Sequence, residues 1–349
     1  MNNVSPISTS STSIIPTPTS SAPDVSVIMP TYNCLEYLPR AVDSVLSQSV
    51  DLELLIVDDC SDDGSDLWLA QLAQSDHRVK VIQGQHNGVS AARNLAVQQA
   101  RGEWVAFLDA DDYWYADKLA VQLALHQQVA GVVLSFTDYD HFSEQDEDLG
   151  TCFNFWPRFY ELLQKKANAE SKKTSWVTAQ PFDRMMVLTG KEKTAIYEEN
   201  VIGTSTVMVK RQALQNANGF DEALHSASDW DLWLKLLDQG DFAAINQPLM
   251  GYLMRSNSIS RNVERRLASF ETIVQRYKVP MMKLNQDCYG PAAARLQLAW
   301  AECWQQQDGG YWRAIRAYFL VCYRLPSMRN VKAFLSHLIK GCFRTFHGN

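Results

Sequence analysis

Between residues 25 and 108 the chain alternates short apolar segments with segments whose apolar residues recur at helical spacing. Each apolar segment has the length of a buried strand, and each intervening segment is long enough for one helix. The apolar segments are 25–29, 52–57, 79–82 and 104–108, and helices are expected over 35–47, after the turn at 61–65, and over 89–100. The first strand is expected to end at Pro30. This alternation predicts an α/β fold on a parallel sheet with right-handed crossovers.

Polar residues stand directly after three of these predicted strands. Ligands of open parallel sheets bind beyond the carboxyl ends of the strands. We therefore expect the functional site at these ends, which carry Thr31, Tyr32 and Asn33, then Asp58 and Asp59, and then Asp109, Ala110, Asp111 and Asp112.

Beyond residue 130 the alternation becomes irregular, residues 138–200 carry no recognisable motif, and only helices are expected after residue 263. The elements predicted here are a strand at 131–137, a polar loop or exposed helix end at 165–174, a strand at 206–210, a helix at 230–237 that Gly240 stops, and one or two strands within 243–252.

These patterns divide the chain into a leader, an α/β domain and a helical extension. Residues 1–23 are rich in Ser, Thr and Pro and cannot bury enough apolar surface to offset their ordering entropy, so we expect them to be disordered. The domain is expected over 24–262, and the helical extension over 263–349.

Composition excludes several classes of protein. The formal net charge is −7, which gives no general signal for nucleic-acid binding. The seven cysteines are odd in number and widely scattered, which argues against disulfides or a zinc site and favours reduced thiols in the cytoplasm. No apolar run approaches the ~20 residues of a membrane-spanning helix, and the N-terminus lacks the pattern of a secretory signal.

The acidic cluster at 109–112 points to a metal ion. Asp residues often cap the helix that follows a strand, and capping is an alternative explanation for the Asp residues in 61–65. Three carboxylates within four residues repel one another, however, unless a cation neutralises them. A hard cation such as Mg²⁺ or Mn²⁺ prefers oxygen ligands and is completed by substrate phosphates. Such an ion stabilises a departing diphosphate.

Four blocks between residues 25 and 112 resemble a known family. They are Val-Ile-Met-Pro-Thr-Tyr-Asn at 27–33, Leu-Leu-Ile-Val-Asp-Asp-Cys-Ser-Asp-Asp-Gly-Ser at 54–65, Asn-Gly-Val-Ser-Ala-Ala-Arg-Asn at 87–94 and Gly-Glu-Trp-Val-Ala-Phe-Leu-Asp-Ala-Asp-Asp at 102–112. Together they resemble the donor half of inverting family 2 glycosyltransferases. The resemblance implies a GT-A fold, which is a Rossmann-like, mostly parallel sheet flanked by helices, a nucleotide-diphosphate-sugar donor, and Mn²⁺ or Mg²⁺. It also implies that the domain has a nucleotide-sugar-binding half at 24–137 and an acceptor half at 138–262.

The resemblance also implies roles for single residues. Pro30, Thr31 and Tyr32 would line the nucleoside pocket, and either Asp58 or Asp59 would accept a hydrogen bond from the base. Arg93 would lie near the diphosphate; the alternative is a surface salt bridge on its Ala-rich helix. Asp109 would contact the ribose or the metal. The full set is Pro30, Thr31, Tyr32, Asn33, Asp58, Asp59, Asn87, Arg93, Asp109, Ala110 and Arg255 for the donor, with Asp109 and Asp111 on the metal.

An inverting transfer needs a base on the side opposite the leaving diphosphate. In the family this base is the Asp of a Glu-Asp pair that opens a helix after a Gly-Gly-Phe-Asp-Glu stretch. Here Asn218-Gly-Phe-Asp-Glu222 precedes Ser228-Asp229, so Asp229 takes the base position and Ser228 replaces the usual Glu. The alternative is that Ser228 or Asp229 only caps the helix, and Asp231 is the second candidate base.

Three further segments bear on the substrates. In 252–260, Leu253 and Arg255 stand where the family frequently has Arg and His, so Arg255 is a candidate for the diphosphate. The stretch Gly203-Thr-Ser-Thr206 matches the family's strand before the acceptor loop, and its side chains either face the acceptor or pack. The aromatic residues of 138–200 either form a sugar platform or cover a core edge; they are Phe153, Phe155, Trp156, Phe159, Tyr160 and Trp176.

The last 39 residues carry seven Lys or Arg and no Asp or Glu. This segment, 311–349, either lies on an anionic membrane surface, with Tyr311, Trp312, Tyr318 and Phe319 at the interface, or packs on the catalytic domain. We therefore predict a cytoplasmic enzyme, free or peripheral on the inner face of a membrane, with a saccharide or lipid-linked acceptor. The rival functions are a non-catalytic sugar-nucleotide-binding or scaffolding protein and a sugar nucleotidyltransferase, although Pro30-Thr-Tyr-Asn33 is not the Gly-rich phosphate loop of the latter.

Overall fold

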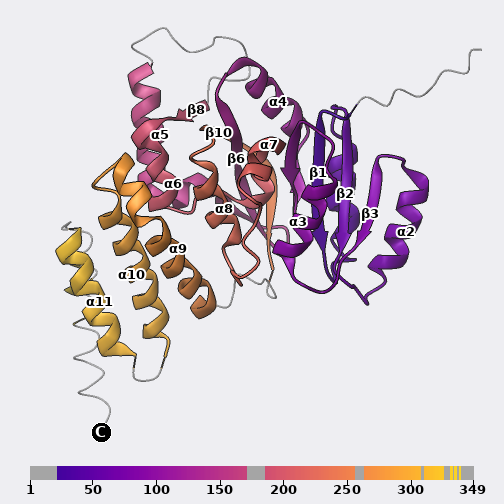
Figure 1. Cartoon of the computed structure of the whole chain (residues 1–349). Coiled ribbons are helices and arrows are strands. Elements are labelled where there is room, and N and C mark those ends of the chain that lie inside the picture. Colours follow the sequence, from indigo (N-terminus) through magenta and orange to yellow (C-terminus); the bar gives the residue numbers. More distant parts are fainter. Residues whose placement is uncertain are drawn as a thin grey trace, which may run out of the picture.

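The computed structural model describes residues 22–170, 185–255, 263–307 and 310–325, together with residues 331, 332, 334, 335 and 338. The leader predicted at 1–23 therefore lies outside the described residues, apart from its last two. The described strands form one ten-stranded, mostly parallel sheet with helices on both faces, as the sequence predicts (Figure 1).

The first half of the sheet has four parallel strands in the order β3-β2-β1-β4. Every residue of β1 and β2 is buried, as expected for central strands covered on both faces. The elements are β1 (Val25–Thr31), α1 (Leu38–Leu46), β2 (Leu52–Asp58), α2 (Ser65–Ser75), β3 (Val79–Gln83), α3 (Val89–Gln99) and β4 (Trp104–Phe107). The alternation predicted from the sequence is confirmed.

Pro30 lies inside β1, so the prediction that it ends this strand is wrong. The carbonyl of Ile28 accepts a hydrogen bond from Leu108 on the β4 side, whereas the carbonyl of Thr31 accepts one from Asp59 on the β2 side. Pro30, two residues after Ile28, therefore faces β4, which has ended at Phe107. Its missing N–H removes no ladder hydrogen bond, because no strand remains there to accept one.

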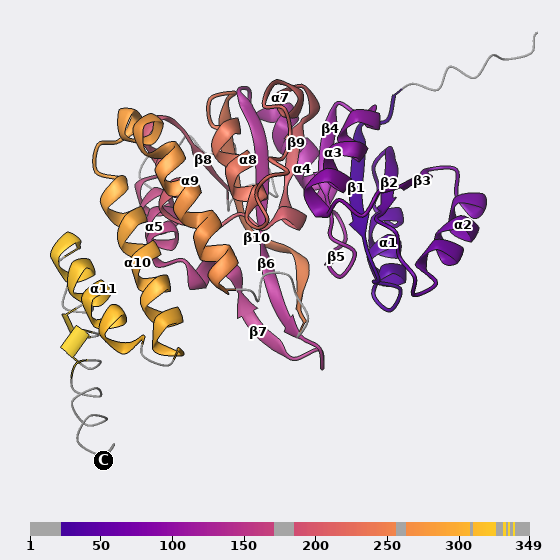
Figure 2. The ribbon, with the colours of Figure 1, turned by 60° about the horizontal axis from the view of Figure 1, so that its bottom comes forward.

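The second half of the sheet continues in the order β9-β6-β10-β5, with β7 paired to β6 and β8 paired to β10. Strands β6 and β10 are parallel and long, and with β7 they project beyond the sheet (Figure 2). The elements are β5 (Tyr113–Trp114), α4 (Lys118–Gln128), β6 (Val132–Ser143), β7 (Asp148–Thr151), η1 (Cys152–Phe155), α5 (Pro157–Glu170), β8 (Met185–Leu188), η2 (Gly190–Lys193), α6 (Thr194–Glu198), η3 (Thr204–Thr206), β9 (Met208–Lys210), α7 (Arg211–Asn216), α8 (Ser228–Leu236) and β10 (Asp241–Met254).

Several predicted boundaries in this half differ from the structure. The strand expected at 206–210 is shorter, because residues 204–206 form the 3-10 turn η3. Two other predictions agree with the structure: the segment 243–252 belongs to a single strand, β10, and residues 165–170 form a helix end, that of α5. Helix α8 ends before Gly240, whose role is a close approach: an added Cβ would lie 2.4 Å from the Val133 side chain.

Helices cover the two faces of the sheet with different cores. Leu38, Val42 and Val45 of α1 pack with β1 and β2 on one face. On the other face α3, α8 and α9 share a core in which Phe107 of β4 contacts the rings of Phe220 and Trp233. The site described below lies between these layers, at the carboxyl ends of β1, β2 and β4.

The C-terminal region is helical, as predicted, with α9 (Val263–Leu284), α10 (Tyr289–Gln305) and α11 (Tyr311–Arg324). Helix α9 joins the core beside α6, where the Tyr197 hydroxyl donates a 2.7 Å hydrogen bond to the carbonyl of Val274. Helix α10 packs on α9, and α11 packs on α10 at the edge of the molecule (Figure 1). Among the described residues, none of the helices combines the length and the hydropathy required to span a membrane.

Candidate active site

Asn33 joins the loop after β1 to the loop after β2. Its side-chain amide donates to the Asp62 carboxylate at 2.8 Å and accepts from the Asp62 N–H at 2.9 Å. Its own N–H donates to the Ser61 hydroxyl, and the next turn is held by Asp63, which accepts the N–H of Leu35. These bonds fix the geometry of the loop that carries Tyr32, whose ring is 48% exposed beside His86.

The two carboxylates after β2 have different surroundings. Both are buried, but Asp58 accepts the N–H of Ser61 within its own loop at 3.1 Å. Asp59 accepts the N–H of Gly88 at the start of α3 at 2.8 Å. Asp59 also lines a pocket of about 210 Å³ together with Gly84, Gln85, Asn87, Ala91, Ala92, Asn94, Leu95, Gln98 and Glu222. Of the two, Asp59 is therefore the one that faces this pocket.

Gly84 makes the position of Asp59 possible. A Cβ at Gly84 would lie 2.5 Å from the Asp59 carboxylate and 2.9 Å from its Cα, closer than atoms in proteins approach. The backbone after β3 thus passes directly against the end of β2, and only glycine permits that approach.

Arg93 forms an ion pair with Asp109 across the end of β4. The two side chains are 2.5 Å apart, and Arg93 is only 5% exposed. The alternative of a surface salt bridge is therefore wrong, because α3 directs the guanidinium inward. The Nε of Arg93 is buried and makes no hydrogen bond in the structure, so this group has bonding capacity left in the site.

Asp111 forms an ion pair with Arg255, 144 positions later in the chain. The guanidinium lies 2.6 Å from the Asp111 carboxylate, 3.7 Å from the Cys34 sulfur and 5.1 Å from the centre of the Tyr37 ring. Burial and the neighbouring Asp109 raise the pKa of Asp111, and the Arg255 charge opposes this shift.

Asp112 is turned away from the other two carboxylates. It is fully enclosed, accepts a 2.6 Å hydrogen bond from the Ser205 hydroxyl, and accepts the N–H of Leu253. Burial and the two neighbouring carboxylates raise its pKa well above the ordinary value. Each member of the acidic cluster thus has its own protein partner, while the raised pKa values of Asp111 and Asp112 show that the carboxylates still repel one another.

The carboxylate oxygens of Asp109 and Asp111 are nevertheless suitable ligands for a hard divalent cation. Two carboxylates, 32% and 20% exposed as side chains, leave the other positions of Mg²⁺ or Mn²⁺ to phosphate and water oxygens, which is the usual arrangement for these ions. Among the described residues there is no group of three or more His, Cys, Asp or Glu side chains that could hold a metal by themselves. A metal here would depend on substrate oxygens.

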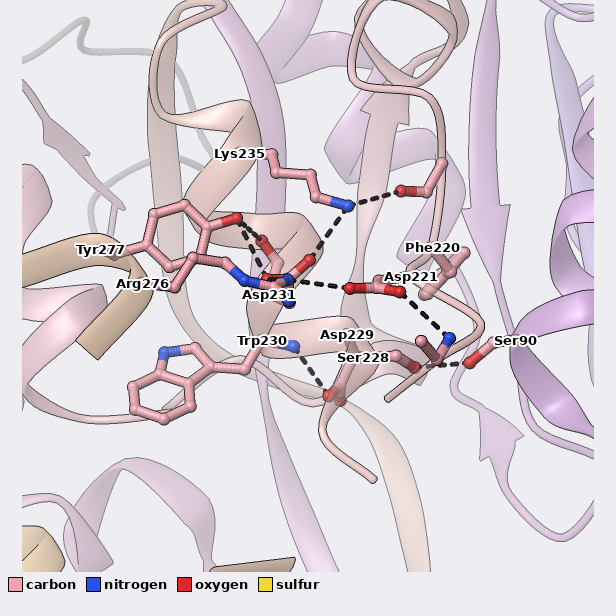
Figure 3. A network of polar contacts seen from close by, with 12 residues as sticks. Ser90, Phe220, Asp221, Ser228, Asp229, Trp230, Asp231, Lys235, Arg276 and Tyr277 are labelled. Carbon is pink, nitrogen blue, oxygen red and sulfur yellow. Dashed lines mark hydrogen bonds and ion pairs between the residues drawn. The ribbon is translucent and has the colours of Figure 1, made fainter. Parts of the chain in front are cut away.

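Asp229 lies at the start of α8 on the other side of the η3 turn. It accepts the Thr204 hydroxyl at 2.9 Å and the N–H of Trp230 at 2.7 Å. The helix is capped by Ala227 with no side-chain hydrogen bond, while the Ser228 hydroxyl bonds to Ser90 at 2.7 Å (Figure 3). Ala227, and not Ser228 or Asp229, is therefore the N-cap residue, and Asp229 accepts an N–H of the first turn. Burial raises the pKa of Asp229, and the nearby Arg93 charge opposes this shift.

Asp231 is unsuited to the role of base for which it was the second candidate. It is 0% exposed and forms ion pairs with Lys235 at 3.0 Å and Arg276 at 2.6 Å, and the Tyr277 hydroxyl donates to it at 3.1 Å (Figure 3). Two cations and a hydroxyl donor already engage this buried carboxylate, so an acceptor hydroxyl does not reach it. Its function is to hold α9 against α8.

The η3 turn connects Asp229 to the acidic cluster, a link that the sequence did not reveal. Thr204 bonds to Asp229, and the adjacent Ser205 bonds to Asp112 and accepts the backbone N–H of Asp109 at 3.0 Å. Gly203 leaves room for the Tyr139 ring, which lies 3.0 Å from the position of an added Cβ. A run of small hydroxyl residues before an apolar strand was the only signal.

The aromatic residues of 138–200 separate into two groups. Phe153 and Phe159 are buried in the core, Trp156 stacks against Arg295, and Trp176 lies outside the described residues. Phe155 is 57% exposed and contacts His141, which in turn contacts Tyr252. The core-edge interpretation therefore holds for Phe153 and Phe159, while Phe155 stands at the surface.

Comparison with known proteins identifies the family of this chain. The family model described as "Glycosyl transferase family 2" matches residues 26–188. The putative teichuronic acid biosynthesis glycosyltransferase TuaG of Bacillus subtilis is 34% identical over 246 residues, which cover 69% of this chain and 82% of that protein. The chain belongs to glycosyltransferase family 2. This membership rules out the nucleotidyltransferase alternative.

Two further comparisons bear on substrate and fold. The Escherichia coli enzyme WfgD, named a UDP-Glc:alpha-D-GlcNAc-diphosphoundecaprenol beta-1,3-glucosyltransferase, is 29% identical over 244 residues, covering 68% of this chain and 80% of that protein. The solved mannosyltransferase PcManGT of Pyrobaculum calidifontis, in complex with GDP-Man and Mn²⁺, superposes with a TM-score of 0.57 at 19% identity, covering 94% of this chain and 82% of that one. The fold of this family 2 glycosyltransferase is therefore GT-A.

Proposed function

We propose that this glycosyltransferase moves a sugar from a nucleotide-diphosphate donor to an acceptor hydroxyl with inversion, assisted by Mn²⁺ or Mg²⁺. The observation that carries the proposal is the η3 bridge: Thr204 and Ser205, adjacent in the chain, hold Asp229 and the acidic cluster on opposite sides of one turn. A carboxylate of raised pKa thus faces a pair of carboxylates suited to a metal and a diphosphate.

On the donor side, the loops after β1 and β2 would hold the nucleoside. Pro30 and Thr31 end a fully buried strand, and the exposed Tyr32 ring offers a face for the base. Asp59 is our choice over Asp58 for the base contact, because it faces the pocket that Asn87 also lines. Ala110, between Asp109 and Asp111, is buried and packs in the core of this half of the sheet, so its side chain does not reach the donor.

The diphosphate would lie between Arg93 and Arg255. Each guanidinium already pairs with one carboxylate of the acidic cluster, at 2.5 and 2.6 Å respectively. Asp109 and Asp111 would hold the metal, which neutralises charge on the departing diphosphate when it is bound. The two arginines would then exchange carboxylate for phosphate oxygens, which suit a guanidinium equally well.

Asp229 would act as the base. The acceptor oxygen forms a bond to the anomeric carbon as the bond to the diphosphate oxygen breaks, and the hydroxyl proton passes to Asp229. The Thr204 hydroxyl fixes the orientation of the carboxylate, and burial raises its pKa toward the range in which a base is effective.

Turnover of a panel of UDP, GDP and dTDP sugars with Mn²⁺ tests the proposal. We expect wild type to consume one of them, and Asp111→Asn and Asp229→Asn to lose activity, while Asp66→Asn, at an exposed position of α2, stays active. If wild type turns over none of the donors but still binds one, the non-catalytic alternative replaces this proposal. If Asp229→Asn is as active as wild type, the base assignment is wrong.

The acceptor is proposed to be a saccharide or a lipid-linked saccharide in polysaccharide or glycoconjugate synthesis. This rests on relatives named for teichuronic acid biosynthesis and for transfer to a diphosphoundecaprenol-linked sugar. A lipid-linked acceptor would require a cytoplasmic enzyme that is peripheral on the inner face of the membrane. Transfer to a synthetic diphospholipid-linked sugar, compared with the same sugar lacking the lipid, measures this preference.

A further inference from the structure

Helix α11 presents a row of large side chains to the solvent. Trp312, Phe319 and Tyr323 are 67%, 57% and 80% exposed, and the exposed Arg316 lies among them. Positions 312, 316, 319 and 323 follow one another at intervals of four, three and four residues. At 3.6 residues per turn they occupy one side of the helix.

The opposite side of α11 packs against the rest of the protein. Ala314, Ala317 and Tyr318 are buried in a small core with Ala301 of α10. Tyr318 is only 5% exposed, and the Tyr311 hydroxyl donates to the carbonyl of Leu338. The prediction that Tyr311 and Tyr318 would lie at a membrane interface is therefore not supported by their orientation, whereas Trp312 and Phe319 point outward.

Exposed arginines surround this row. Arg313 and Arg324 lie beside Arg316 on the outer side of α11, and within the described part of the chain none of the three forms an ion pair. Residues 311–349 contain no Asp or Glu, so the segment supplies no counter-charge of its own. A chain with a net charge of −7 thus carries three exposed arginines on this one helix.

We propose that this surface binds the headgroup region of an anionic phospholipid bilayer. The surface, called the α11 face, consists of Trp312, Arg313, Arg316, Phe319, Tyr323 and Arg324. Its arginines would pair with lipid phosphates, while Trp and Tyr rings, apolar with one polar edge, settle at the level of the headgroups. Helix α11 lies at one edge of the molecule (Figures 1 and 2), and Phe334 contacts the ring of Phe319 there.

Charge decides between a bilayer and a second copy of the chain. A symmetric dimer through the α11 face would bring the arginines of one copy against those of the other, with no acidic residue in the segment to separate them. An anionic bilayer supplies the opposite charge over the whole face. The exposed aromatic rings meet a partially apolar environment there, which removes them from water.

The inference deepens the proposed peripheral location, but it does not depend on sugar transfer. Binding is measured by co-sedimentation of the full chain with sucrose-loaded vesicles of phosphatidylcholine, with or without 30% phosphatidylglycerol (about a third of the lipid charged, as in anionic membranes). Donor-induced thermal stabilisation, measured on the same samples, reports separately on the nucleotide site. A variant that loses vesicle binding but still binds the donor then has a defect in the α11 face and not in the nucleotide site.

Two variants and one control test the α11 face. Arg316→Glu/Arg324→Glu should weaken binding to the anionic vesicles by at least about 20-fold, since each basic residue near such a surface contributes roughly fivefold. Trp312→Ser/Phe319→Ser should weaken binding to a similar extent, because the apolar contact is lost. Lys80→Glu/Lys191→Glu makes the same charge change at exposed positions of β3 and η2 and should leave vesicle binding close to wild type.

Three outcomes would overturn the inference. Wild type could fail to bind anionic vesicles, it could bind neutral and anionic vesicles equally, or the control could lose as much affinity as the α11 variants. Light scattering, which measures the oligomeric state, tests the alternative that a second copy of the chain covers the α11 face. A wild-type dimer that Trp312→Ser/Phe319→Ser converts to a monomer, without any vesicle binding, would make the face a contact between copies.

Discussion

Replacing Arg255 with Gln should affect metal binding in opposite directions depending on whether nucleotide is present. Arg255 neutralises Asp111 in this structure, with 2.6 Å between the two groups. A metal that binds without nucleotide must displace this guanidinium. A metal that arrives with a diphosphate offers the guanidinium new phosphate partners. The variant frees Asp111 for the metal but removes a cation from the diphosphate.

The size of the effect follows from the exposure of the pair. Two unit charges about 4 Å apart attract by about 4 kcal/mol at an effective dielectric constant of 20. Both side chains keep about a fifth of their surface in water, so screening and desolvation reduce the net value to about 1–2 kcal/mol. We therefore expect Mn²⁺ alone to bind Arg255→Gln about 5- to 30-fold more tightly than wild type.

Electron paramagnetic resonance of free Mn²⁺ measures this affinity directly, first without nucleotide and then with UDP or GDP. With nucleotide we expect the order to reverse, because the variant lacks a diphosphate ligand. Arg101→Gln is the matched control: its pair with Glu53, at 2.8 Å, lies at the amino ends of the strands, far from the site. If Mn²⁺ alone binds Arg255→Gln no more tightly than wild type, Arg255 does not compete for Asp111 and the reasoning fails.

Three further results are expected. Asp229→Asn should lower kcat by about 10²- to 10⁴-fold with donor affinity unchanged in calorimetry, since the base acts on the acceptor; weaker donor binding would instead place Asp229 in the donor site. Burial raises the pKa of Asp138 to about 7 in the folded state. Between about pH 4 and pH 7 the Asp138 carboxyl is therefore protonated in the folded state and ionised in the unfolded state. The unfolding free energy of wild type should therefore fall from about pH 4 to pH 7, relative to Asp138→Asn, by up to about 4 kcal/mol; parallel curves from urea titrations would contradict this. Gly84→Ala should destabilise the fold by about 1–3 kcal/mol and weaken nucleotide binding, because its Cβ would meet Asp59. Gly290→Ala, where nothing lies within 4 Å, should not lower the melting temperature, and equal losses in both would remove Asp59 as the cause.

The first half of the chain shows how far local patterns reach. The alternation of apolar runs and helical segments depends on spacings of two and 3.6 residues, which any short window of sequence displays. The strands β1 to β4 and the helices between them were therefore predictable. The consequence that Asp59, Asp109 and Tyr32 stand at one edge of the sheet also followed, because parallel strands share their carboxyl ends.

Boundaries and partners were less accessible, for identifiable reasons. Pro30 was expected to end β1, but the strand continues because β4 stops before the position where the missing N–H would bond. Asp229 and Asp231 both follow the same loop, and both are acidic. Only the packing of α9 reveals that Arg276 forms an ion pair with Asp231. The residue that supplies this cation lies 45 positions away, beyond the range of any local pattern.

By itself, the sequence determined the family, the GT-A fold, and the order of the motifs along the sheet, since these depend on residue type and local periodicity. Only the tertiary structure decided which carboxylate each arginine faces, that Thr204 and Ser205 connect Asp229 to the acidic cluster, and which rings of α11 meet the solvent. Those features are contacts between segments far apart in the chain. Many other pairings of the same residue types have the same charges. The packing of the segments determines which of these pairings form, because it sets the burial and the distances of the side chains.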